Sequence, residues 1–174
     1  MATKKSIRVL VGTLVIAAWI LGCAIQAGAE TMNYKSYVWM NKMETVPIDD
    51  VEGHVVILTQ RGGFDVFENG EFATLKSVGI NDLIKGSGSA MTYTTISFAD
   101  GSTIMLKGQG TVKGTTAGRV ASSESTSEII KGTGRFEGIK GSVSGKTRNL
   151  PAEKGEAGPK QYGEGTITYT VPNK

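Results

Sequence analysis

His54 and Glu52 are the side chains of this sequence best suited to acid–base chemistry. His54 is the only histidine among 174 residues, and an imidazole changes charge near neutral pH, as a general base must. It stands at the start of an apolar segment, where a β-strand is expected to reach an opening of the fold. A lone histidine at the start of a strand more often has a structural role, so both roles stay open here.

Residues for other kinds of chemistry are few. One histidine cannot make a multi-histidine metal site, and no loop has the dense Asp/Asn spacing of a calcium site. Residues 141–147 have three residues between their glycines, where a phosphate-binding loop needs four. No serine lies in a Gly-x-Ser-x-Gly elbow with plausible partners. We therefore expect no metal and no cofactor, and an enzyme with these residues would be a cofactor-free cyclase or isomerase.

The first 29 residues have the pattern of a secretory signal peptide. Three basic residues precede an apolar run over 9–21, and small residues then lead up to Ala29. This pattern predicts cleavage between Ala29 and Glu30, because the run is shorter than the roughly 20 residues of a membrane-spanning helix. The mature chain, residues 30–174, is then expected in the periplasm or outside the cell, with no stable membrane span. A loose lipobox ending at Cys23 leaves lipid attachment as a minor alternative.

Removal of this leader changes the charge balance. The whole chain has 19 Lys and Arg against 16 Asp and Glu, and the leader contains three basic residues and no acidic one. The mature chain is therefore balanced at 16 of each, which argues against a nucleic-acid-binding surface. Cys23, the only cysteine, is lost with the leader, so disulfide and thiol chemistry are lost too.

Short apolar segments separated by turn signals indicate an all-β fold. Asn69-Gly70 and Asp100-Gly101 each stand between such segments and predict two-residue hairpin turns. No stretch of ten or more residues has the 3.6-residue apolar period of a helix. We predict a single closed antiparallel barrel of about eight strands over 30–174. Residues 30–50 are expected to form a first strand or an N-terminal arm, and 150–163 a mobile loop.

Glycines recur at short, uneven intervals between 132 and 145. Phe136 and Ile139 stand among them three residues apart, which breaks strict two-residue alternation and indicates a bulge or bend near Gly138. We interpret the segment as a sharply coiled strand that closes a small barrel. The following glycines are expected to have structural roles: Gly132, Gly134, Gly138 and Gly141.

The segment 132–141, Gly-Thr-Gly-Arg-Phe-Glu-Gly-Ile-Lys-Gly, resembles the signature strand of the allene oxide cyclase and dirigent barrel superfamily. Residues 49–54, 98–102 and 165–169 are similar to that family in order and spacing, and the resemblance extends over 45–171. It implies an eight-stranded antiparallel barrel with an apolar cavity. Some members are cyclases and others steer phenoxy radical coupling. The cysteine that accompanies the plant cyclases' catalytic groups has no counterpart here, because no cysteine follows Cys23.

Two functions follow as hypotheses. In the first, the exported barrel binds an apolar small molecule in its interior, with or without a cyclase or isomerase activity, and Tyr93, Phe136 and Tyr169 are the candidate ligand contacts. In the second, the barrel is filled by side chains and serves as a non-catalytic envelope scaffold or interaction protein. Geometry alone allows both, since eight strands can hold either side chains or one small ligand. Assembly into a homo-oligomer is left open.

Overall fold

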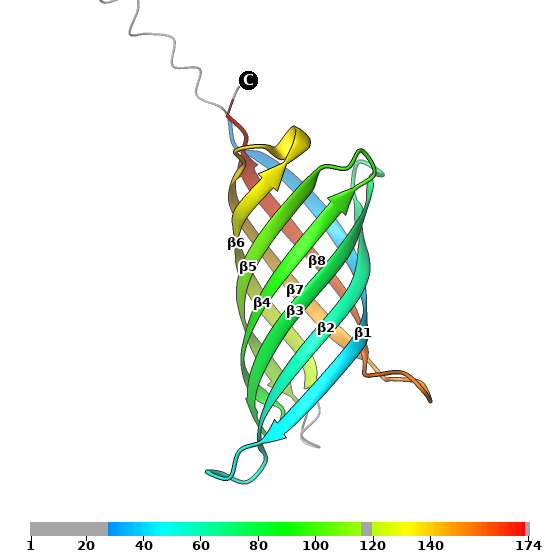
Figure 1. Cartoon of the computed structure of the whole chain (residues 1–174), viewed down its shortest axis with the longest axis vertical. Helices are drawn as coiled ribbons and strands as arrows, with labels where there is room; N and C mark the ends of the chain where they lie inside the picture. The colour runs from blue at the N-terminus through cyan, green and yellow to red at the C-terminus, as the bar shows by residue number, and fades with distance from the viewer. Residues whose placement is uncertain (1–27, 116–119, 173–174) are drawn as a thin grey trace, which may run out of the picture.

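The computed structural model describes residues 28–115 and 120–172. Eight antiparallel strands pair in chain order, and β1 also pairs with β8, which closes a barrel (Figure 1). The elements are β1 (Glu30–Pro47), β2 (His54–Phe67), β3 (Phe72–Ile84), β4 (Ser87–Phe98), β5 (Thr103–Gly114), β6 (Val120–Thr133), the 3-10 helix η1 (Gly134–Phe136), β7 (Lys140–Leu150) and β8 (Lys160–Thr170). The predicted all-β barrel is thereby confirmed. Residues 1–27 of the predicted signal peptide lie outside the described residues, so the signal peptide stays a prediction.

Each strand places alternate residues inside and outside the barrel, as the pleat requires. Strand β3 is the clearest case, since exposed and less exposed positions alternate along its whole length. The turns at Asn69-Gly70 and Asp100-Gly101 are longer than the two residues predicted, because residues 68–71 and 99–102 connect the strands. Their glycines are left-handed, with φ of 84° at Gly70 and 83° at Gly101, and each glycine N–H donates to the carbonyl of the residue that ends the preceding strand. This is a type I turn closed by a glycine bulge, which also connects the strands of a hairpin. The hairpins that these dipeptides predict are therefore present.

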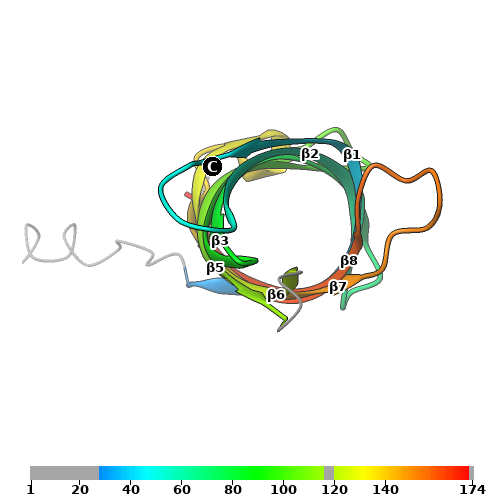
Figure 2. The same cartoon turned by 90° about the horizontal axis from the view of Figure 1, so that it is seen from below.

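Most of residues 30–50 and part of residues 150–163 belong to strands. Residues 30–47 form β1 rather than an arm, and β1 lies between β2 and β8. Strand β7 continues to Leu150 and β8 begins at Lys160, so only 151–159 remain as a connection. This connection projects away from the ring of strands that is seen along the barrel axis in Figure 2.

The sequence suggested that the glycine-rich segment forms one coiled strand. The structure shows instead that it is divided. Strand β6 ends at Thr133, η1 follows, and β7 begins only at Lys140. The cause lies in the backbone: Gly134 and Gly138 have φ of 64° and 75°, and these left-handed residues turn the chain across the end of the barrel. At Gly132 a side chain has no room, because a Cβ there would collide with the carbonyl oxygen of Phe136.

One end of the barrel is filled by a packed core. Its buried side chains come from every strand except β1: Phe67, Ala73, Ile96, Phe98, Ile104, Leu106, Ile129, Phe136, Ile139, Val143, Ile167 and Tyr169. Aromatic rings are at its centre, with 5.4 Å between the ring centres of Phe67 and Phe98 and 4.9 Å between those of Phe98 and Phe136. We call this end the aromatic plug.

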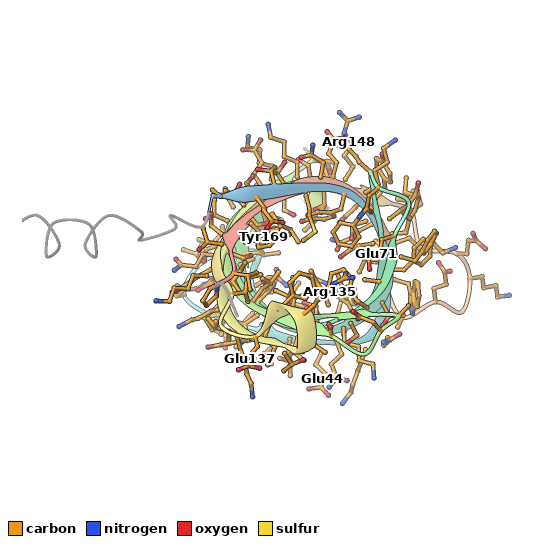
Figure 3. All side chains as sticks on the ribbon, turned by 90° about the horizontal axis from the view of Figure 1, so that it is seen from above. Glu44, Glu71, Arg135, Glu137, Arg148 and Tyr169 are labelled. Atoms are coloured by element: carbon orange, nitrogen blue, oxygen red, sulfur yellow. The ribbon has the colours of Figure 1, made fainter. Side chains whose placement is uncertain are left out.

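An arginine covers the aromatic plug from outside. The guanidinium of Arg135 lies 4.7 Å from the ring centre of Phe98 and 4.8 Å from that of Phe136, within the range of a cation–π contact. It also pairs with Glu71 at 2.5 Å and with Asp100 at 3.6 Å, which tie it to the β2–β3 and β4–β5 turns. Figure 3 looks onto this end and shows Arg135 and Glu71 lying over the interior. The plugged end is therefore held shut by groups from three separate turns.

Candidate functional site

Beyond the aromatic plug the barrel is hollow. The cavity has a volume of about 1300 Å³ and extends to the opposite end, where the connections after β1, β3 and β7 surround an opening that we call the mouth. Apolar side chains line it near the mouth, among them Val55, Ile57 and Leu83. This volume is somewhat larger than the roughly 300–1,000 Å³ of most ligand pockets, so a small molecule has ample room. The filled barrel that the second hypothesis assumes is therefore limited to one end.

The middle of the cavity is lined by small polar residues. Hydroxyl and amide side chains point inward from six strands: Ser36, Thr59, Ser77, Asn81, Thr92, Thr94, Ser123, Ser125, Ser127 and Thr147. Some satisfy each other, as Thr94 does when its hydroxyl donates to that of Ser77 at 3.1 Å. Together they form a polar belt between the apolar mouth and the aromatic plug. The interior is thus more polar than the purely apolar cavity that the family resemblance implies.

Asp65 is the most unusual side chain of the cavity wall. It is 0% exposed, and neither carboxylate oxygen has a hydrogen-bond partner among the described residues. The hydroxyl of its cross-strand neighbour Ser36 is close enough to oppose the shift in pKa but falls short of hydrogen-bond geometry. Burial dominates and raises the pKa of Asp65 to about 6. A carboxyl group with this pKa can both release and accept a proton near neutral pH.

Arg61 lies on the same inward face of β2, four residues nearer the mouth. Its Nε is buried without a hydrogen-bond partner, and burial lowers the pKa of its guanidinium. Its cross-strand neighbours at this level, Met40 and Ser77, carry no charge. Arg61 is therefore a partly buried cation with an enclosed Nε, and no anion stands beside it among the described residues.

Tyr34 completes the group. Its ring packs against Phe67 with 6.0 Å between ring centres, and its hydroxyl reaches over Gly165 on the adjoining β8 toward Gly145 on β7. Burial and, to a smaller extent, the neighbouring Asp65 raise the pKa of Tyr34 well above its ordinary value. The phenol is thus a neutral hydrogen-bonding group at physiological pH, next to a carboxyl that titrates.

The structure places neither predicted acid–base residue inside the cavity. His54 lies on the outer face of the barrel, where its ring nitrogens contact Asp50 at 2.5 Å and Asp82 at 2.8 Å. These hydrogen bonds, with Asp50 the stronger influence, raise the pKa of His54. Glu52 stands at the rim of the mouth and pairs with Lys85 at 3.3 Å. His54 therefore ties the β1–β2 turn to β3.

The three predicted ligand contacts lie in different places. Tyr93 is 46% exposed on the outer face of β4 near Lys107, because Thr92 and Thr94 take the inward positions. The structure therefore places Tyr93 outside the cavity. Phe136 and Tyr169 lie inside the barrel, within the aromatic plug. The hydroxyl of Tyr169 donates to the carboxylate of Glu30 at 2.6 Å, and burial is the main reason that its pKa rises to about 12.

Sequence reasoning missed Asp65, Arg61 and Tyr34. A signal was present, since Arg61, Gly63 and Asp65 share one face of β2 with the apolar Val55 and Ile57. Apolar residues stand on both faces of this strand, however, so alternation did not show which face points inward. The pairing of β1 with β2 and β8 decides it, because it brings Ser36 and Asp65 together.

Within the described ranges no three His, Cys, Asp or Glu side chains gather as metal ligands would. Over the same part of the chain, no helix has the length and apolarity needed to cross a membrane.

No protein-family model matches the sequence, and no curated protein matches it either. Five solved chains do match, among them two dirigent proteins. One is the pterocarpan synthase dirigent protein PsPTS1, with a TM-score of 0.51 and 12% identity over 84% of this chain and 97% of that one. The other is the pterocarpan synthase dirigent protein GePTS1, with a TM-score of 0.50 and 11% identity over 83% of this chain and 89% of that one. The chain therefore has the eight-stranded barrel fold of dirigent proteins, at a large distance in sequence.

Proposed function

From a barrel of the dirigent type with a hollow, polar-belted interior, we infer that this protein binds a small molecule inside the barrel. The ligand enters at the mouth and places its apolar body along the wall. The fully buried Asp65, with both oxygens unpartnered, carries this inference. A buried carboxyl group without partners costs stability, and such groups occur mainly where a ligand or a reaction needs them.

The same group supports a catalytic version of the proposal. Asp65 can exchange a proton with a bound molecule, while the Tyr34 hydroxyl can hydrogen-bond an oxygen that gains charge. These two groups suffice for an isomerase or cyclase that works by proton transfer and by holding its substrate in one conformation. Two proteins of the same fold are pterocarpan synthases, which supports this version without identifying a substrate.

Binding inside the barrel can be tested with a neutral fluorescent probe, N-phenyl-1-naphthylamine. We expect saturable binding that does not change between low and high salt, because apolar burial is not screened. Thr92→Trp combined with Ser125→Trp narrows the polar belt and should weaken the probe by about tenfold or more, equivalent to about 1.4 kcal/mol. The matched control replaces Thr95 and Thr126, which lie on the outer faces of the same strands, with tryptophan. It should change the affinity for the probe less than twofold.

Two results would overturn the proposal. One is that no probe binds the folded protein. The other is that the affinity survives tryptophans at the inward positions but falls with the outward pair. Either result would favour a partner-binding function instead.

A partner-binding function has one observation in its favour. The outer face of β2, β3 and β4 carries adjacent apolar side chains that are between 38% and 48% exposed: Leu58, Val78, Ile80, Met91 and Tyr93. A contiguous exposed apolar patch is a common feature of interaction sites. This face does not explain the unpaired groups inside the barrel, so we keep it as the second candidate.

Export of the mature barrel belongs to the same proposal. Strand β1 begins at Glu30, and the Glu30 carboxylate accepts the hydrogen bond from Tyr169, so cleavage after Ala29 would leave the barrel complete. Amino-terminal sequencing of the protein recovered from the periplasm or medium should give Glu30 as the first residue. A chain that starts at a lipid-modified Cys23, or one that retains its leader, would contradict this.

A further inference from the structure

Arg61 and Asp65 carry opposite charges inside one cavity and yet do not neutralise each other. Both point inward from β2, four residues apart, which separates their Cα atoms by about 13 Å along an extended strand. No ion pair among the described residues involves either side chain. Asp65 keeps two unpartnered oxygens and Arg61 an unpartnered Nε. Each charge is therefore left for a group that the chain itself does not supply.

The surroundings of Arg61 favour an anion from outside the chain. Met40 lies beside it on β1, Ser77 on β3, and Thr94 follows Ser77 on β4. None of these can balance a positive charge, and Thr94 already donates its hydroxyl to Ser77. Buried charges in proteins are normally paired, because desolvation of an isolated ion is costly. The planar guanidinium also suits a carboxylate or sulfonate, which it can contact through two parallel hydrogen bonds.

The rest of the cavity indicates an organic anion rather than a simple ion. A volume of about 1300 Å³ is far larger than an inorganic anion needs. Apolar wall is available beside the polar belt, from Leu75, Ile96 and Leu106. Asp65 lies on the plug side of Arg61. An ionised Asp65 would therefore repel the acidic group of a ligand if that group entered deeper than Arg61. The acidic group is thereby directed to Arg61.

We propose that the ligand of this cavity is an organic anion, whose acidic group pairs with the guanidinium of Arg61 while its apolar body packs against Leu75, Ile96 and Leu106. This proposal rests on the proposed function, namely small-molecule binding inside the barrel, and adds the charge of the ligand and the residue that recognises it. Asp65 then remains available to accept a hydrogen bond from a hydroxyl or N–H group elsewhere on the ligand.

Two probes with the same ring system separate the charge from the apolar body. 8-Anilinonaphthalene-1-sulfonate carries a sulfonate that N-phenyl-1-naphthylamine lacks. Arg61→Gln should weaken the sulfonate probe by about tenfold or more, the range expected for a hydrogen-bonded charge pair, and change the neutral probe less than threefold. Lys85→Gln removes one positive charge at the mouth, where Lys85 pairs with Glu52, and should change both probes less than threefold. Competition between the probes shows whether they share the cavity.

The variants must be folded for this comparison, which far-UV circular dichroism and thermal melting establish. Should Arg61→Gln not fold, Arg61→Lys keeps the charge but loses the planar fork. It should weaken the sulfonate probe more than threefold, with the neutral probe unchanged.

The possible outcomes are distinct. A neutral probe that binds, together with a sulfonate probe that Arg61→Gln does not weaken, would overturn the anion proposal and leave small-molecule binding intact. Equal losses for both probes would assign Arg61 a purely structural role, and losses with Lys85→Gln alone would place the anion at the mouth. Failure of both probes to bind the folded wild-type protein would overturn the proposed function as well.

Discussion

Replacement of Phe136 with alanine should lower the free energy of unfolding by about 3–5 kcal/mol, the range for removal of a buried phenylalanine. Phe136 is 3% exposed, and its ring lies 4.9 Å from that of Phe98 and 6.1 Å from that of Tyr169, measured between centres. The guanidinium of Arg135 also lies over this ring. Because rings and guanidinium all contact this one side chain, its removal leaves a cavity that the neighbours cannot easily fill. Equilibrium unfolding in urea or guanidinium chloride would measure the loss.

Phe72 provides the matched control. It is 58% exposed at the start of β3, so Phe72→Ala removes the same atoms from a place where little apolar surface is buried. We expect a loss of less than about 1 kcal/mol for this variant. Similar losses for the two variants would show that the aromatic plug is not the part of the barrel on which stability depends.

Asp65→Asn should stabilise the protein at pH 8, with little effect at pH 4. Burial raises the pKa of Asp65 from 3.8 to about 6 in the folded protein. Below pH 3.8 the carboxyl is protonated in both folded and unfolded chains, so aspartate and asparagine are alike in charge. Between pH 3.8 and 6 only the unfolded chain ionises freely, and the wild-type protein loses stability as the pH rises. A difference of about two pH units corresponds to a gain of at most about 3 kcal/mol for the variant above pH 6.

The measurement is the free energy of unfolding of both proteins from pH 4 to pH 8. The other titratable groups that line the cavity and its mouth are common to both proteins: Tyr34, Arg61, Glu52, Lys85, Glu124, Lys146 and Glu164. Asp49→Asn, at an exposed position in the β1–β2 turn, controls for the removal of a negative charge and should give no such pH-dependent gain. A constant difference across the pH range, or a loss of stability at pH 8, would mean that Asp65 is satisfied in solution.

Such a gain would bear on function as well as on stability. If the protein is less stable with aspartate than with asparagine, Asp65 lowers the free energy of unfolding. Residues of binding and catalytic sites typically have such a cost in stability. Titration of Asp65→Asn with the neutral probe would then show whether the gain in stability is accompanied by a change in affinity.

Two features of the fold could be predicted from particular residues. Asn69-Gly70 and Asp100-Gly101 indicated hairpins because glycine readily adopts the left-handed backbone that a tight hairpin turn requires, although the turns are longer than the two residues predicted. The bend at Gly138 was predictable for a similar reason, since Phe136 and Ile139 cannot share one face of a regular strand. Local conformational limits of this kind act within a few residues, so they can be detected without knowledge of the rest of the chain.

The pattern of apolar residues in the sequence by itself also determined the fold class. Short alternating segments without a helical period allow only β-structure, and the glycine-rich segment resembled the dirigent barrel whose fold the structure has. The predicted signal peptide and the charge balance of the mature chain likewise depend on sequence alone.

The tertiary structure alone decided what the interior contains. Strand β2 is apolar on both faces, so the direction of Arg61 and Asp65 depends on register with β1 and β3 rather than on the strand's own pattern. Tyr93 shows the converse, because pairing of β3 with β4 turns it outward. Burial, and with it the raised pKa of Asp65, is a property of the closed barrel, since a carboxyl group is desolvated only when residues distant in sequence surround it.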